Sequence, residues 1–62
     1  MKIVVFDEKE QKHKFLRGKL SNCFWTSKEE DAWEYTKDDY KKVLEDFRNK
    51  KMNPNYTSLG YK

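Results

Sequence analysis

The sequence predicts an α+β fold in which a small antiparallel sheet of two or three strands packs against one amphipathic helix. Apolar segments alternate with short polar turns in the N-terminal part, residues 37–50 carry the apolar spacing of a helix, and aromatic residues make up 16% of the chain. A chain of 62 residues forms one domain and buries only about 60% of the surface that its unfolded form exposes. A few large side chains must therefore form the core. Their clustering and the aromatic content indicate a folded chain, although 40% of its residues are charged.

The strands are expected in the first 25 residues. Lys2–Phe6 is the clearest, because β-branched and aromatic residues follow one another there until the polar run Asp7–Lys12 begins. His13–Arg17 is the second strand, and Gly18 is expected to end it. Two strands joined by so short a polar run form an antiparallel hairpin. A further extended segment is expected within Leu20–Trp25.

The helix expected at about residues 37–50 is the most strongly indicated element. Thr36 stands before a first turn rich in acids and fits the capping-box position, with Asp39 three residues later. Asn53 and Pro54 end the helical pattern. Its apolar residues follow the i, i+3, i+4, i+7 spacing of one helix face: Tyr40, Val43, Leu44 and Phe47.

Residues 27–35 allow two interpretations. In the first, Ser27 caps a short helical turn at residues 28–32, with Glu30 at the capping-box position, and Trp33–Tyr35 is extended. In the second, the segment forms the first turns of one long helix. Thr36 is a weak helix former inside a helix and a good cap at its start, which favours the break.

The last residues follow the helix as a separate segment. We interpret residues 1–52 as the α+β domain and residues 53–62 as a C-terminal tail. The tail contains Tyr56, Leu59 and Tyr61, and a purely flexible segment rarely needs three large apolar groups. It therefore either packs back along the sheet or provides contacts to a partner.

The chain lacks the residue patterns of catalytic and metal sites. Cys23 and His13 are its single cysteine and histidine, which is too few for a structural zinc site or an internal disulfide. We expect Cys23 to be a small buried hydrophobic residue. Gly18 and Gly60 stand alone, so no glycine-rich phosphate loop is present. The acidic clusters lie where helix starts favour negative charge. The prediction is a protein without cofactor, metal or catalytic residue, and not an enzyme.

The longest apolar run is Ile3–Phe6, far shorter than a signal peptide core or a membrane span. We therefore expect a cytoplasmic protein that makes no membrane contact.

Charge is distributed unevenly along the chain. Residues 1–26 carry six Lys and Arg against three Asp and Glu, residues 27–47 carry four against eight, and residues 48–62 carry four against none. Cations with interleaved aromatic rings are typical of single-stranded nucleic-acid binders. Nucleic-acid binding is therefore the alternative hypothesis, although the acidic middle segment would repel phosphates. Its candidate residues are Lys12, Lys14, Arg17, Lys19, Arg48, Lys50 and Lys51.

The favoured hypothesis is protein binding, because ten aromatic residues exceed what one thin core layer can cover. Trp and Tyr dominate the energetics of protein interfaces. Core filling accounts for Phe6, Phe15, Tyr40 and Phe47, and some of the remaining rings are expected to stay exposed as protein-binding residues. These are Trp25, Trp33, Tyr35, Tyr56 and Tyr61. A homodimer would solve the same burial problem and stays open beside a different protein partner.

The order of the aromatic and threonine residues resembles that of short uncharacterised accessory proteins of bacteriophages and prophages. In these, a hairpin leads to a Trp-Thr step, then to an Ala followed by an aromatic-Thr step, and then to a closing amphipathic helix. The matching segments are Phe24–Thr26, Ala32–Thr36, Tyr40 and Val43–Leu44, within about residues 1–50. The resemblance implies a non-enzymatic protein that inhibits or modulates a host protein or defence complex. It implies no functional residue, because the matching positions look like core, and residues 54–62 depart from the pattern.

Overall fold

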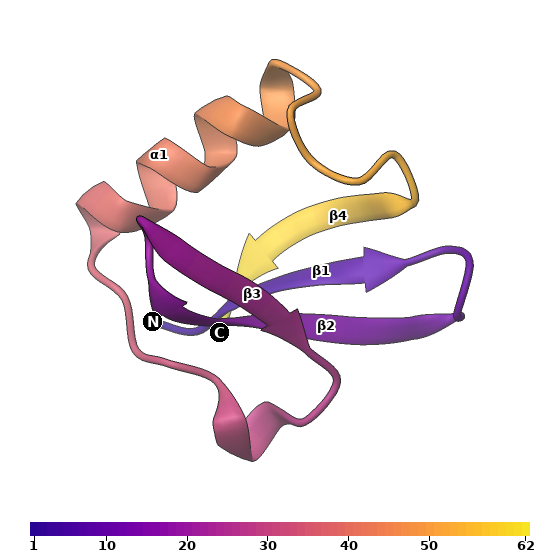
Figure 1. Ribbon diagram of the computed structural model, residues 1–62, viewed down its shortest axis with the longest axis horizontal. Coiled ribbons are helices and arrows are strands. Elements are labelled where there is room, and N and C mark those ends of the chain that lie inside the picture. The colour runs from indigo at the N-terminus through magenta and orange to yellow at the C-terminus, as the bar shows by residue number, and fades with distance from the viewer.

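All 62 residues are described by the structure, a computed structural model. Four strands form one antiparallel sheet in the order β3-β2-β1-β4, shown in Figure 1 with the single helix α1. The strands are β1 (Ile3–Asp7), β2 (Lys12–Lys19), β3 (Asn22–Thr26) and β4 (Tyr56–Tyr61). The α+β class is therefore confirmed, while the sheet has four strands where two or three were expected.

The additional strand comes from the C-terminal segment. β4 pairs with β1, with Tyr61 opposite Ile3 and Tyr56 opposite Asp7. Beyond these pairs, the backbones of Lys2 and Lys62 exchange two hydrogen bonds of 3.0 and 2.9 Å. The two chain ends consequently lie together, as Figure 1 shows. Most of the segment 53–62 thus packs along the sheet as β4, which is one of the two arrangements expected for it.

Gly18 does not end the second strand, because β2 continues through it to Lys19. Its φ of +96° lies in the region that favours glycine. A Cβ built at Gly18 would lie 2.8 Å from the backbone oxygen of Asn22, which is closer than ordinary packing allows. Glycine is therefore needed at the point where β2 lies opposite Cys23.

The pairing register divides the side chains between two sheet faces, since residues directly opposite one another point to the same side. On the helix face, which α1 covers, Leu16 lies opposite Trp25 and Lys14 lies opposite Val5. On the other side, named here the far face, Phe15 lies opposite Val4 and Arg17 lies opposite Phe24.

The core lies between the sheet and α1. Ile3 from β1, Leu16 from β2, Tyr35 from the linker and Val43 from α1 form one buried cluster. Burial of each such side chain contributes about 1.5–3 kcal/mol. Five partly buried residues surround the cluster: Leu20, Trp25, Tyr40, Met52 and Leu59. Of the four aromatic residues expected to fill the core, only Phe15 is fully buried, and it lies on the far face.

Helix α1 spans Lys37–Arg48 and begins with the expected capping box. The Thr36 hydroxyl accepts a hydrogen bond of 3.2 Å from the Asp39 backbone, and the Asp39 carboxylate accepts one of 3.2 Å from the Thr36 backbone. The helix ends two residues before the expected position. Lys50 adopts a left-handed φ of 57°, and the amides of Lys50 and Lys51 donate back to the carbonyls of Phe47 and Asp46. This is a Schellman ending, with lysine where glycine is usual.

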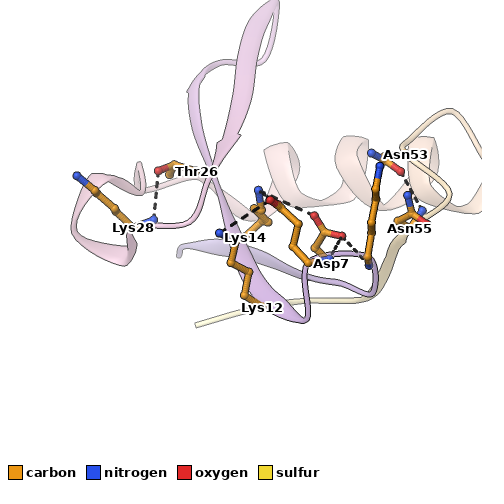
Figure 2. Close-up of polar contacts among 9 residues, drawn as sticks. Asp7, Lys12, Lys14, Thr26, Lys28, Asn53 and Asn55 are labelled. Carbon is orange, nitrogen blue, oxygen red and sulfur yellow. Dashed lines mark hydrogen bonds and ion pairs between the residues drawn. The ribbon is translucent and has the colours of Figure 1, made fainter.

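Residues 27–36 follow the first interpretation, a break before the main helix. The expected turn is a single 3-10 turn, η1 (Glu29–Asp31), followed by extended backbone at Ala32. The capping box expected for Ser27 was wrong, because the N-cap is Lys28 and no side chain caps it. Instead, the Lys28 amide donates a hydrogen bond of 3.2 Å to the Thr26 hydroxyl, as Figure 2 shows.

The 3-10 turn η1 lies over part of the far face. Glu29 pairs with Lys62 at 3.4 Å, and Asp31 pairs with Arg17 at 3.9 Å. The Lys62 ammonium stands 5.6 Å from the centre of the Phe15 ring. These contacts explain why Phe15 is buried although no helix covers its face of the sheet.

Candidate protein interface

Strand β3 is an edge of the sheet, and nothing in the chain pairs with its outer side. Its neighbour on the inner side is β2, and none of the backbone hydrogen bonds outside the sheet and the helix involves residues 22–26. An edge strand presents a row of free N–H and C=O groups to another chain. The sequence of β3, NCFWT, contains no charge and no proline, and its register with β2 is continuous. It therefore lacks the devices that commonly protect sheet edges.

The opposite edge, β4, is also uncharged but is irregular. Its register with β1 shifts between Val4 and Phe6, and Ser58 adopts a left-handed φ of 54°. Such a bulge bends the strand and interrupts its regular row of backbone groups. The amide of Tyr56 is also engaged, by the carbonyl of Asn53 at 3.0 Å. The two edges therefore differ in backbone geometry, and β3 is the one that offers a continuous pairing surface.

The side chains of β3 present apolar groups on both faces. Phe24 points to the far face with 56% of its surface exposed, and the Arg17 guanidinium stands 5.2 Å from the centre of its ring. Trp25 points to the helix face, where its ring packs edge-on against Tyr56 at 5.5 Å. Cys23 is exposed, so the expectation that it is buried was wrong. It lies on the terminal strand near the turn of the hairpin, where no neighbouring strand covers it.

Beside β3, the helix face forms a groove of about 430 Å³ between α1 and the β2–β3 hairpin. The side of the groove formed by α1 is lined by Lys42, Glu45 and Asp46, and the carboxylates of Glu45 and Asp46 make no ion pair. The groove lies directly beside the free edge, so a strand added to β3 would place every second side chain near it. Its apolar lining comes from Leu16, Leu20, Cys23, Trp25, Val43 and Met52.

The five residues predicted to bind a protein do not form one patch. Trp25 and Tyr56 pack together and are half-buried on the helix face. Tyr61 is 60% exposed on β4, where its ring packs against Tyr40 of α1. Trp33 is 42% exposed in the linker before α1.

Tyr35 is buried, which corrects the expectation that it is one of the exposed aromatic residues that bind a protein partner. Its hydroxyl donates a hydrogen bond of 2.5 Å to the Gly18 carbonyl, and burial raises its pKa to about 12. Phe24 is exposed beside Trp33 and Tyr61, and it was not among the rings expected to stay exposed. The alternation in β3 was the available signal, because it places Phe24 on the face opposite Trp25.

The basic residues predicted to bind nucleic acid are separated and partly neutralised. Lys12 and Lys14 lie on the helix face, while Arg17 lies on the far face. Lys14 pairs with Glu10 at 2.5 Å, Lys12 approaches the same carboxylate at 3.9 Å, and Arg17 pairs with Asp31. Because these cations already face carboxylates, they offer a weak site for phosphates. Exposed cations without an ion pair remain at Lys19 and at the end of α1, where Arg48, Lys50 and Lys51 lie.

Asp7 is the buried charged residue of the chain, and its contacts are those of a turn. Its carboxylate accepts hydrogen bonds from the Lys9 and Glu10 amides at 3.0 and 3.2 Å, and Lys14 lies 3.9 Å away (Figure 2). Burial raises the pKa of Asp7, but the amides and Lys14 outweigh it and the pKa is lowered. The hydrogen bond to Glu10 raises the pKa of Lys14. These groups close the β1–β2 turn and face no groove of their own.

The single cysteine and the single histidine are not brought together. His13 packs edge-on against the Phe6 ring at 5.2 Å, on the far face. Cys23 lies opposite Gly18, which is five residues beyond His13 in β2. At the rise per residue of a strand, this places Cys23 and His13 about 16 Å apart. No group of three or more His, Cys, Asp or Glu side chains is arranged to hold a metal ion.

Comparison with known proteins adds no relative. No family model, no curated protein and no solved structure matches the chain. No helix in the structure has both the length and the apolar character needed to cross a membrane.

Proposed function

We propose that this chain is a non-enzymatic protein-binding module whose binding surface is the β3 edge. The observation that carries the proposal is the regular, uncharged outer side of β3, which has no backbone partner. A partner strand would gain main-chain hydrogen bonds from the edge, and its side chains would determine specificity. Phe24 on one face and the groove beside Trp25 on the other provide apolar contacts for those side chains.

The class of partner follows from the resemblance to phage accessory proteins. It makes a bacterial host protein or a defence complex the expected target, and inhibition or modulation the expected effect. Blocking a target through a strand edge requires no reaction, which agrees with the expectation that the protein is not an enzyme. Aromatic residues beside the edge would supply most of the binding energy, since interface hot spots are enriched in Trp and Tyr and lie in well-packed pockets.

A site-specific cross-linker tests this proposal. A photoreactive phenylalanine analogue at position 24 is compared with the same analogue at Lys9, which is exposed in the turn at the other end of β2. In nuclease-treated bacterial lysate, we expect a discrete protein adduct from position 24 and none from position 9. Equal adducts from both positions, or none from position 24, would refute β3 as the binding edge.

Nucleic-acid binding is the competing hypothesis, and it now depends mainly on Arg48, Lys50 and Lys51. It predicts that the chain binds a labelled single-stranded DNA oligonucleotide and that affinity falls steeply as salt rises. Replacing the three residues by Gln would then abolish binding, while Phe24→Lys would leave it intact or strengthen it. Fluorescence anisotropy measures both effects. A salt-sensitive complex that needs these cations would favour this hypothesis over protein binding.

A further inference from the structure

We infer that a second copy of the chain occupies the β3 edge in the free protein, so that two β3 strands pair antiparallel across a two-fold axis at Phe24. The inference rests on β3 being the binding edge proposed above. It names an occupant for that edge when no other partner is present. Pairing of identical strands is isologous, which is the commonest arrangement of soluble homodimers. The resulting sheet would continue through both copies.

The β3 sequence is complementary to itself in this register. Phe24 lies opposite the partner's Phe24, Cys23 lies opposite the partner's Trp25, and Asn22 lies opposite the partner's Thr26. The central pair is aromatic on aromatic, the next combines a small with a large side chain, and the outer pair is polar. Cross-strand pairs of these kinds stabilise antiparallel sheets. Because β3 carries no charge, self-pairing places no like charges directly opposite one another.

The groups beside the edge are compatible with a second copy. On the far face, the nearest charge is Arg17, which is held over its own Phe24 ring and paired with Asp31. On the helix face, the partner's Trp25 would lie next to Cys23, an exposed residue of the apolar groove. Self-pairing would therefore cover Phe24 and part of the groove together.

The other sheet edge explains why the assembly should stop at two copies. A molecule with two open edges can continue to add copies into a fibre. Here β4 carries the bulge at Ser58 and does not present a regular edge. One open edge per chain gives a closed dimer.

The interface is small, which sets the concentration at which it forms. Two five-residue strands bury less than the roughly 1,200 Å² at which stable interfaces begin, so the dimer belongs to the transient class. We expect a dissociation constant between about 1 µM and 1 mM. Sedimentation velocity across this range should show the average mass rising from one chain to two. The net charge of +3 repels the second copy, so the dimer should not weaken as salt rises.

Two variants test the interface with a matched control. Phe24→Lys places two like charges at the two-fold axis and should shift dimerisation at least tenfold toward monomer. Asn49→Lys adds the same charge at the exposed end of α1 and should leave dimerisation unchanged. Circular dichroism verifies that both variants are folded. A dimer that persists in Phe24→Lys would overturn the inference.

A disulfide fixes the register independently of charge. In a Cys23→Ser background, Phe24→Cys brings two thiols together at the axis, within the Cα separation of about 7 Å that a disulfide allows. Thr26→Cys in the same background is the control, because its two copies would lie about 13 Å apart at the rise of a strand. We expect a covalent dimer from position 24 under mild oxidation and none from position 26. Equal dimers at both positions would overturn the register.

Failure of this inference can be distinguished from failure of the proposed function. A chain that stays monomeric at every concentration, and forms no disulfide at position 24, has no second copy on β3. If position 24 nevertheless cross-links to a lysate protein, the edge binds a different protein and the proposed function stands. If position 24 cross-links to no protein, the proposed function and the second copy on β3 are both refuted.

Discussion

Tyr35 connects the linker before α1 to the β2–β3 hairpin, and the variant Tyr35→Phe isolates one atom of that connection. The ring is buried in the core cluster, and the hydroxyl donates to the Gly18 carbonyl at 2.5 Å. The linker is held separately by its backbone, since the Tyr35 amide donates to the Met1 carbonyl at 2.7 Å and the Tyr35 carbonyl accepts from the N-terminal ammonium at 2.8 Å. Phenylalanine retains the ring and these backbone contacts.

Two effects set the expected size of the change. Losing one hydrogen bond costs about 0.5–1.5 kcal/mol, and leaving the Gly18 carbonyl without this donor adds to the cost, so we expect about 1–2 kcal/mol at neutral pH. For a domain of this size, that lowers the melting temperature by about 8–15 °C. The total stability of a 62-residue chain is roughly 3–9 kcal/mol, so the loss is a substantial share.

The second effect depends on pH. Burial raises the pKa of Tyr35 to about 12, whereas an unfolded tyrosine titrates near pH 10. A raised folded-state pKa means that the contribution of Tyr35 is fully present below about pH 10 and is lost as the pH rises toward 12. Two pH units correspond to at most about 2.7 kcal/mol. The wild-type chain should therefore lose more stability across this window than Tyr35→Phe.

Urea unfolding followed by tryptophan fluorescence at pH 8, 10 and 12 measures both effects. All other titratable side chains are common to the two proteins, so the difference between their curves isolates Tyr35. Tyr61→Phe is the matched control, because that ring is 60% exposed and should change little at any pH. Parallel curves for wild type and Tyr35→Phe above pH 10 would show that the buried hydroxyl does not control alkaline stability.

Two further predictions concern backbone positions with φ above zero. Gly18→Ala should lower stability by about 2 kcal/mol, because a side chain at φ +96° is strained and its Cβ would lie 2.8 Å from the Asn22 carbonyl oxygen; a melting temperature within about 2 °C of wild type would contradict this. Lys50→Gly should instead stabilise the chain by about 1 kcal/mol, since glycine favours the left-handed residue that ends α1. Thermal unfolding by circular dichroism tests this gain, and a lower melting temperature would show that the lysine side chain outweighs the strain.

The elements predicted correctly from the sequence are those defined by local interactions. The start of α1 depends on the exchange between Thr36 and Asp39, three residues apart, and its apolar spacing is visible within four turns. Its end was less accurate, because the expected stop signals were Asn53 and Pro54. The chain instead stops at the left-handed Lys50, a residue type that gives no such signal.

The segment of β4 was not predicted as a strand, because the β1 residues with which it pairs lie 49 to 58 positions earlier in the chain. Nothing local distinguishes YTSLGY from a tail that carries a few apolar residues. The exposure of Phe24 at the candidate interface could not be predicted for a similar reason, because it also depends on how distant segments pack. Alternation indicates that Phe24 and Trp25 point to opposite faces, but the covered face depends on where α1 packs. From the sequence, Trp25 was therefore expected to stay exposed, whereas the structure leaves Phe24 more exposed.

Ion pairing weakens the nucleic-acid hypothesis more than the distribution of charge along the chain suggested. Counted along the sequence, the cations of β2 form a basic stretch. In the fold they alternate between two faces, and Lys14 and Arg17 each meet a carboxylate from a neighbouring turn. A phosphate would have to displace Glu10 or Asp31 to reach them, which reduces the gain from counterion release.

Composition also fails to distinguish the two edges of the sheet, because neither β3 nor β4 carries a charge. The difference lies in the backbone. β4 closes the sheet late in the chain and must cross a register shift at Ser58, whereas β3 follows β2 through a two-residue turn and remains regular. The features that would protect β3, a lysine or a proline within five residues, are absent although the chain has twelve lysines elsewhere. This contrast with the rest of so highly charged a chain supports the proposal that the β3 edge binds another chain.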